Sequence, residues 1–288
     1  MIVSLCRSLF FWGLLCGSLL YSQLIHASDV WDGPAFTTTP EALRLAAAEI
    51  KAGKDVGATV LLREDHLSFD GQGKETETYH MIYRIENEEG VKGWAETSGE
   101  WEPWRQAKPE IKVRVIGPDG AVHVLDPKTL NDVPVHEEDP EVFSDRRRYG
   151  GPLPAIAVGA IVEEEVTIRD TAPYFAGGSV ERIVLAMNVP VAKSRIVLTH
   201  AEVLPLHFVL HLLPDASVKK SSANGQETIT IENGLLPPYG ERPTHLPPDV
   251  VVRPEVEFGT GTSWHRVAEE YARMVSDKMR PTDVWPTP

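Results

Sequence analysis

The feature that most constrains the fold is the period-two alternation between residues 161 and 168. Apolar and polar residues take opposite sides of the chain: Val162, Val166 and Ile168 against Glu163, Glu165 and Thr167. Successive side chains of a β-strand point to opposite faces of its sheet, and branched side chains favour the pleated backbone. The segment therefore predicts a half-buried strand. We interpret its carboxylates as a solvated face, in preference to a catalytic pair.

Similar alternation recurs along most of the chain. Strands are predicted at 58–70, 76–87, 111–115, 122–124, 180–187, 194–200, 206–212, around 218, and 228–231. Turn residues separate several of them, including Pro118-Asp119-Gly120 and Asn224-Gly225. Strands joined in this way are typical of antiparallel sandwiches and not of βαβ units. We therefore predict a mainly β fold, an antiparallel β-sandwich (immunoglobulin-like or similar). Residues 126–141 are predicted to be an extended surface loop, and Gly150-Gly151-Pro152 a turn.

Two helices frame the predicted strands. Thr39 is a candidate N-cap and Pro40 a first helical residue, and the first helix is expected to end at Gly53. Ser263 is predicted to cap a second helix that ends before Pro281. One face of this helix carries an apolar stripe of Trp264, Val267, Ala268, Tyr271, Met274 and Val275. Such a stripe needs a surface to pack on, so the chain is expected to continue into a further folded part.

The first 28 residues have the layout of a secretory signal. Arg7 precedes an apolar run at 9–20, and Ala27 offers a small residue for cleavage. The run is short for a membrane span, so we expect export to the periplasm or outside the cell, with no stable span after cleavage. The alternative is an uncleaved anchor. Both cysteines, Cys6 and Cys16, lie in this segment, so the exported chain would lack disulfides, thiolate nucleophiles and cysteine metal sites.

The charge balance excludes one class of partner. The chain has 28 basic and 42 acidic residues, and removal of Arg7 with the signal leaves 27 against 42, a net charge of −15. A strongly acidic surface repels phosphate backbones and anionic lipids. We therefore expect no nucleic-acid partner.

Proline content completes the predicted division of the chain. Residues 237–254 contain six prolines and are predicted to be part of a semi-rigid linker that ends in an extended stretch. The predicted units are a signal at 1–28, a lead-in with the short helix at 29–57, the sandwich at 58–236, the linker at 237–260, and the start of another domain at 261–288.

An ordered set of short motifs carries a family resemblance. They are residues 61–64 with His66, the strand at 76–87, Trp101-Glu102-Pro103-Trp104, the segments 116–120 and 125–127, Phe143-Ser144-Asp145, Leu153-Pro154-Ala155 and Gly159. Together they resemble a bacterial domain of unknown function that lies directly upstream of transglutaminase-like domains. The resemblance spans roughly residues 60–212.

The end of the sequence is similar to the helix that leads into a transglutaminase-like core. That core uses a Cys-His-Asp triad, but this sequence stops at Pro288, before the nucleophile, so no triad residue can be assigned. The resemblance implies a non-catalytic accessory module without a cofactor. Its partner would be a transglutaminase-like domain, in cis or in trans. The expected domain junction is Trp264, Val267 and Tyr271.

Two clusters are candidate binding residues. Asp145 precedes Arg146, Arg147 and Arg148, whose guanidinium groups could bind a carboxylate, phosphate or acidic glycan, or could simply offset the acidic surface. Trp101 and Trp104, with Trp94 nearby, could stack on sugars or a peptide, or could cover a sheet face. These residues support an alternative function, a stand-alone cell-envelope module that binds glycan or peptide.

A third hypothesis is a hydrolase built on histidine and glutamate. His207 and His211 are predicted to share one side of a strand, but zinc needs at least a third ligand, and the spacing supplies none. Of the three consecutive glutamates, only Glu163 and Glu165 share a face. We therefore predict no metal site.

Overall fold

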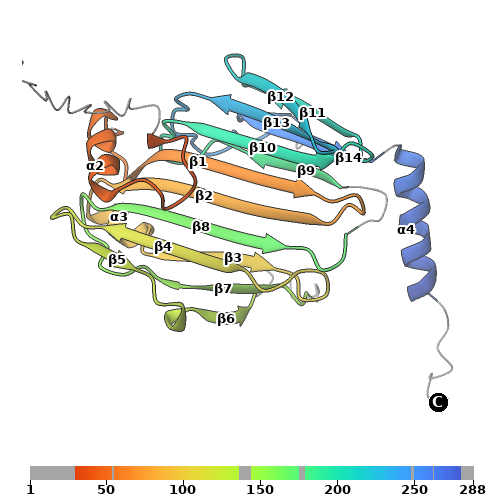
Figure 1. The fold of residues 1–288 in the computed structure, drawn as a ribbon, viewed down its shortest axis with the longest axis horizontal. Helices are drawn as coiled ribbons and strands as arrows, with labels where there is room; N and C mark the ends of the chain where they lie inside the picture. Colours follow the sequence, from red (N-terminus) through yellow and green to blue (C-terminus); the bar gives the residue numbers. More distant parts are fainter. Residues whose placement is uncertain are drawn as a thin grey trace, which may run out of the picture.

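The structure is a computed structural model that describes residues 30–53, 55–135, 144–174, 179–247, 250–261 and 263–279. The predicted signal at 1–28 and the last residues, 280–288, lie outside the described residues. The described part is mainly β, with three α-helices, and its sheets pack in a sandwich-like arrangement (Figure 1). The predicted fold class is confirmed.

The largest element is an eight-stranded sheet in the order β12-β13-β10-β1-β2-β8-β4-β5. Its strands are β1 (Ala58–Phe69), β2 (Glu75–Ile85), β4 (Glu110–Ile116), β5 (Val122–Val124), β8 (Ile161–Arg169), β10 (Ser194–Ala201), β12 (Ser217–Ala223) and β13 (Gln226–Asn233). All neighbours are antiparallel except β1 and β10, which run parallel. The predicted Asn224-Gly225 turn joins β12 to β13, and both residues have positive φ, as such a tight hairpin requires.

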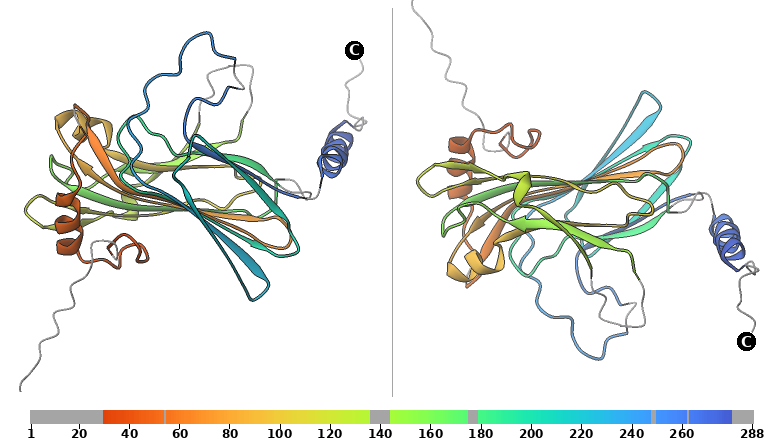
Figure 2. Two further views of the ribbon diagram at one scale, coloured as in Figure 1. Left: turned by 90° about the horizontal axis from the view of Figure 1, so that it is seen from above. Right: turned by 90° about the horizontal axis from the view of Figure 1, so that it is seen from below.

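Two three-stranded sheets form the second layer (Figure 2). One has the order β11-β14-β9, with bounds Leu206–His211, Glu255–Thr260 and Val180–Val184. The other has the order β3-β7-β6, with bounds Glu96–Trp101, Arg147–Pro152 and Asn131–Pro134. Both lie on the same side of the main sheet, which we call its inner face.

The core lies between these layers and includes the end of the predicted linker. Val256 and Phe258 on β14 are buried, and the Phe258 ring packs edge-on against Phe69 of β1 with centroids 5.8 Å apart. Aromatic pairs in this geometry add to the stabilisation that burial provides. The last residues of the range 237–260 therefore form the middle strand of a sheet.

The first helix, α2 (Pro40–Glu49), covers one end of the other face, which we call the outer face. The Thr39 side chain accepts a hydrogen bond from the Ala42 N–H, which confirms the predicted cap. The helix ends before the predicted Gly53, because Arg84 donates to the carbonyls of Ala47 and Ile50 and so satisfies its last turn.

Several short elements, including β3, were missed from the sequence. Residues 126–141 are not simply an extended loop, since they contain the 3₁₀ turn η1 (Pro127–Thr129) and β6. The predicted Gly-Gly-Pro turn is wrong, because these residues continue β7. A Cβ on Gly150 would lie 2.4 Å from the Thr97 carbonyl oxygen, so glycine serves close strand approach here. Helix α3 (Glu88–Gly93), capped by Asn87, was also not predicted.

The final helix, α4 (Trp264–Lys278), lies beyond one end of the sheets (Figure 1). Ser263 accepts a hydrogen bond from the Arg266 N–H, so the predicted N-cap is confirmed. Its apolar stripe is largely uncovered: Trp264 is 76% exposed and Tyr271 59%. None of the described helices combines the length and apolarity that a bilayer span requires.

Candidate functional site

The outer face of β8 carries a buried ion cluster, which corrects the prediction of a solvated face. Glu163 is only 2% exposed. Its carboxylate accepts from Arg114 Nε at 2.6 Å and from the Phe36 N–H at 2.7 Å, and it lies 3.1 Å from His80 Nε2. Burial alone would raise the pKa of Glu163, but these hydrogen bonds and the Arg114 charge hold it below its usual value. This cluster holds the lead-in chain at Phe36 against the sheet, and both oxygens of the Glu163 carboxylate are engaged in these contacts.

A second outer-face cluster is centred on Arg195. Its guanidinium donates to Glu64 at 2.6 Å, to Glu232 at 2.9 Å and to Asp32 of the lead-in chain. Burial would raise the pKa of Glu64, but hydrogen bonds from His66 and Arg195 lower it. The cluster therefore holds the lead-in against the sheet, and its buried carboxylate is paired.

The inner face carries carboxylates that form no ion pair within the described residues: buried Glu164 on β8, and half-buried Glu75 and Glu77 on β2 and Glu181 on β9. Burial raises the pKa of Glu77 to about 7 and that of Glu164 to about 7. Burial raises the pKa values of Glu75 and Glu181, whose carboxyl groups lie against each other. The nearby Glu181 raises the pKa of Glu75 further, to about 10, whereas the hydrogen bond with Glu75 opposes the rise in the pKa of Glu181. Buried carboxylates without a cation favour the neutral form.

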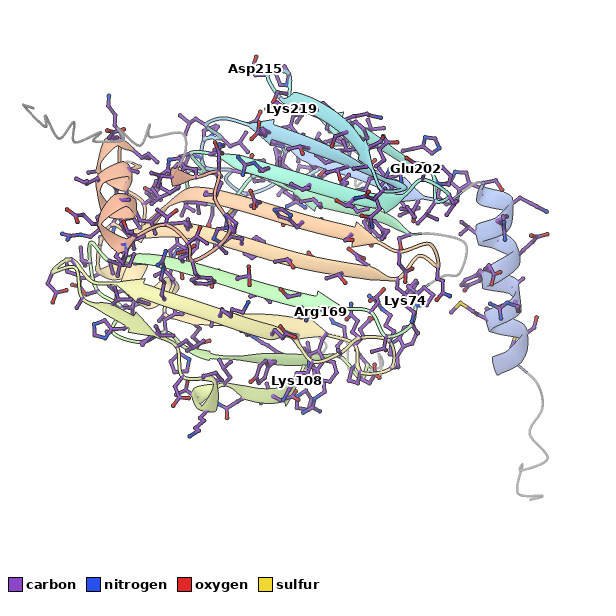
Figure 3. The ribbon with its side chains drawn as sticks, in the orientation of Figure 1. Lys74, Lys108, Arg169, Glu202, Asp215 and Lys219 are labelled. Carbon is purple, nitrogen blue, oxygen red and sulfur yellow. The ribbon has the colours of Figure 1, made fainter. Side chains whose placement is uncertain are left out.

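Three of these carboxylates line one cavity of about 420 Å³. Glu75 and Glu77 form one side and Glu181 the other, and Trp264 and Val267 of α4 contribute to its edge. Lys74, labelled in Figure 3, marks this end of the main sheet, which faces α4. We call this space the acidic cavity.

The acidic cavity has one cation at its wall, and that cation is engaged. Arg105 donates to Glu102 at 2.5 Å and to Asp170 at 2.8 Å. Its guanidinium also lies 5.3 Å from the centre of the Tyr174 ring. The Oε1 atom of Glu75, in contrast, is fully buried and has no hydrogen-bond partner. A buried oxygen without a hydrogen-bond donor costs free energy of folding. A donor brought into the cavity would therefore be stabilised there.

An apolar groove of about 480 Å³ adjoins the acidic cavity. It is lined mainly by β9, β11, β14 and the first turn of α4, including Val180, Phe208 and Val209. Trp264, Val267 and Val180 line both spaces. The acidic cavity, this groove and the exposed stripe of α4 are therefore contiguous, and we call them together the junction surface. Two of the predicted junction residues, Trp264 and Val267, lie at its centre, and Tyr271 extends it along α4.

The predicted tryptophan cluster divides into different environments. Trp94 packs on Tyr83 with ring centroids 4.8 Å apart, and Trp101 is half-buried. Trp104 is 51% exposed and lies 5.8 Å from the Tyr174 ring, beside Arg105. Of the predicted binding tryptophans, Trp104 presents the more open ring, close to the acidic cavity.

The arginine run is largely engaged with acids of the same chain. Arg146 binds Glu100, Arg147 binds Asp132 at 2.7 Å, and Arg148 donates to Ser98 at 3.0 Å. Exposed Asp145 precedes them. The pairing of β3 with β7 sets Trp101 opposite Arg147, so the two predicted binding clusters do meet along one strand pair. These arginines support the small sheet, and Arg148 lines a cavity of about 260 Å³, which is smaller than either the acidic cavity or the apolar groove.

The histidines on β11 are separated in their contacts. His207 lines the apolar groove, whereas His211 Nε2 lies 3.3 Å from Glu257. Within the described residues, no group of three or more potential ligands is arranged to hold a metal ion.

Sequence reasoning missed the residues of the acidic cavity. Glu75 and Glu77 occupy the same face of β2 as Tyr79 and Met81, the predicted apolar face. Acidic residues on the otherwise apolar face of a strand were a usable signal. Such residues are either buried in the core or lie where the core opens to a cavity or to solvent. Glu181, in contrast, comes from a distant strand whose pairing no local pattern reveals.

Comparison with known proteins gives a family match. A model of the family DUF3857, a domain of unknown function with a solved structure, matches residues 71–239, more than half of the chain. No protein with a curated description matches the sequence.

Solved structures share the fold at low identity. A crystal structure of a candidate protease from Parabacteroides distasonis ATCC 8503 superposes with a TM-score of 0.64 at 14% identity, covering 77% of this chain and 47% of that one. An M1 zinc metallopeptidase from Deinococcus radiodurans gives a TM-score of 0.36 at 10% identity, covering 71% of this chain and 42% of that one. This chain spans less than half the length of both proteins.

Proposed function

This chain belongs to the DUF3857 family of domains of unknown function, and from that premise we propose that it is a non-catalytic accessory module that packs against a transglutaminase-like domain. The partner lies in cis or in trans. Contact is made through the junction surface, and the module positions the catalytic domain.

One observation carries this proposal: the apolar stripe of α4 is uncovered. Trp264 and Tyr271 are both more than half exposed, and the helix has only 15 residues. Isolated helices of this length are marginal in water, and most helices are stabilised by packing an apolar face. Exposed aromatic residues beside an apolar groove are typical of an interaction site. A partner that covers α4 and the groove resolves both features.

Two further points support the proposal. The candidate protease that shares the fold is about twice as long as the matched part, so in that protein the fold is one portion of a larger chain. The sequence of α4 also resembles the helix that leads into a transglutaminase-like core. The signal-like pattern at 1–28 supports export, and we propose a periplasmic or extracellular location.

Co-purification with a transglutaminase-like domain, supplied as a separate tagged polypeptide, tests the proposal. Tyr271→Glu introduces a charge in the middle of the stripe and is expected to abolish co-purification while the sandwich stays folded, as judged by circular dichroism. Leu45→Glu is the matched control, because Leu45 is 66% exposed on α2, at the opposite end of the sheets. Equal recovery of the domain with Tyr271→Glu and with wild type contradicts the proposal.

A second candidate function rests on the exposed Trp104–Tyr174 pair. Adjacent exposed rings offer a stacking surface for an envelope glycan or peptide. Retention of the purified protein on cell-wall material is then expected to fall with Trp104→Ala. Trp264→Ala, which removes an even more exposed indole, is expected to leave retention unchanged. Failure of the wild-type protein to be retained removes this candidate.

A further inference from the structure

We propose that the polypeptide covering the junction surface inserts a basic side chain, lysine or arginine, into the acidic cavity, next to apolar side chains that fill the adjoining groove. The inference rests on the proposed accessory role and specifies the chemistry of the partner. The partner segment is therefore a basic residue flanked by apolar residues.

The geometry of the cavity defines what it accepts. Glu75 and Glu77 project from β2, and Glu181 faces them from β9. A volume of about 420 Å³ accommodates a long side chain. The edge of the cavity includes α4, so a partner seated on α4 has direct access to it.

Within the described residues these carboxylates form no direct ion pair, although the charges of Arg63 and Arg105 lower the pKa of Glu77. Arg105, at the wall, already donates to Glu102 and Asp170, and the buried Oε1 atom of Glu75 receives no hydrogen bond from a nitrogen or hydroxyl donor. Two buried carboxylates on the outer face behave differently, as Glu163 and Glu64 each bind an arginine. A partner that brings a guanidinium or ammonium group offers hydrogen-bond donors to the Glu75 oxygen and a positive charge that complements the acidic lining of the cavity.

The groove supplies the second half of the specificity. Val180 separates the two spaces and lines both, so one partner segment reaches both at once. Apolar contacts there provide affinity, whereas the buried charge pair selects the sequence and register of the partner. A partner with an acidic or neutral residue at this position brings no positive charge to the cavity, so we expect it to bind more weakly.

Matched peptides test the charge requirement with the full chain. The first probe is acetyl-Leu-Arg-Leu-amide. The second replaces arginine with citrulline, which keeps the shape and removes the charge. Titration calorimetry at pH 8 and low salt is expected to show binding of the arginine peptide and about tenfold weaker binding of the citrulline peptide. Equal affinities, or no binding of either peptide at millimolar concentration, overturn the inference.

Variants locate the effect. Glu77→Gln combined with Glu181→Gln keeps the side-chain shapes and removes repulsion, so the fold is expected to survive. This double variant should bind both peptides equally and weakly. Glu49→Gln, an exposed change on α2 at the far end, should preserve the discrimination. A double variant that still prefers the arginine peptide contradicts the assignment of the cavity.

The outcome is separable from the test of the accessory role. Tyr271→Glu lies outside the acidic cavity, so it should lose the transglutaminase-like domain yet retain the preference for the arginine peptide. If the domain fails to co-purify with wild type while the peptide preference holds, the accessory role fails and the cation site stands. The reverse result removes the cation site alone.

Discussion

Glu163 and Glu164 are neighbours on β8, and both are more than 90% buried, yet they differ in ionisation. Glu163 faces outward to Arg114 and His80, and its pKa lies below the usual value. Glu164 faces inward with no ion pair, and burial raises its pKa to about 7. A one-residue step along a strand changes the face, and for these two neighbours that step separates a carboxylate with a cation from one without.

The same contrast separates the two faces of the main sheet. Ion clusters on the outer face hold the lead-in chain and satisfy their buried acids. On the inner face the end near α4 leaves carboxylates without cations, beside an apolar groove. The outer-face carboxylates are paired with cations of the same chain. The carboxylates at the inner-face end near α4 form no such pair, and this is where we propose that another polypeptide docks. The difference therefore distinguishes structural from interaction sites made of the same residue type.

The largest expected effect comes from Glu163→Gln. Loss of this carboxylate leaves Arg114 buried without its counter-charge, and such changes typically cost about 3 to 5 kcal/mol. Urea denaturation at pH 7 measures the loss. Glu165→Gln is the control on the same face of β8, since its partner Lys112 is largely exposed and the pair contributes about 1 kcal/mol or less.

The pH dependence of that loss has a defined sign. The folded-state pKa of Glu163 is depressed, so its contribution is present above the unfolded value near 4.5 and is lost as the pH falls through the folded value. The difference between wild type and Glu163→Gln should therefore shrink in acid. A difference as small as that for Glu165→Gln contradicts the idea that the outer cluster is structural.

Glu164→Gln is expected to act in the opposite direction. The folded-state pKa of Glu164 is raised from 4.5 to about 7, so wild type loses stability as the pH rises through this window. The neutral amide avoids that loss and should stabilise the fold by about 1 to 3 kcal/mol above pH 7, with little effect below pH 4.5. Urea denaturation across pH 4 to 8 measures the trend. A variant less stable than wild type at pH 8 contradicts the contrast between the faces.

The smallest effect is expected from Asp32→Asn on the lead-in chain. Asp32 binds Lys193 and Arg195 and is almost half exposed, so its pairs contribute about 0.5 to 1 kcal/mol. The loss should diminish at high salt because ions screen exposed pairs. Thermal unfolding at two ionic strengths tests this. An effect independent of salt indicates that Asp32 acts through packing instead of charge.

The sequence predicted what local rules determine. Alternation located most strands of the main sheet, and the caps Thr39 and Ser263 and the Asn224-Gly225 turn were placed correctly. Each depends on residues close together in sequence. The apolar stripe of α4 was predicted for the same reason, since helical periodicity marks such a stripe without reference to the rest of the fold. Its role as a domain junction stays a prediction.

Other features depend on partners far away in the chain. Glu163 was misassigned because Arg114 and Phe36, which make its burial possible, lie in separate segments. The acidic cavity escaped notice because Glu181 meets Glu75 only through tertiary packing. Strands β6 and β7 were missed because they are short and glycine-rich or proline-containing, and pairing with each other and with β3 overrides their low propensity.

The central place of β14 has a consequence for the order of folding during synthesis. Its sheet is complete only when residues 255–260 join β9 and β11, so these two strands wait unjoined while the intervening chain is made. Helix α4 follows immediately. The nascent module thus closes the β11-β14-β9 sheet just as α4 emerges, so the proposed junction surface is among the last parts of the described fold to form during synthesis.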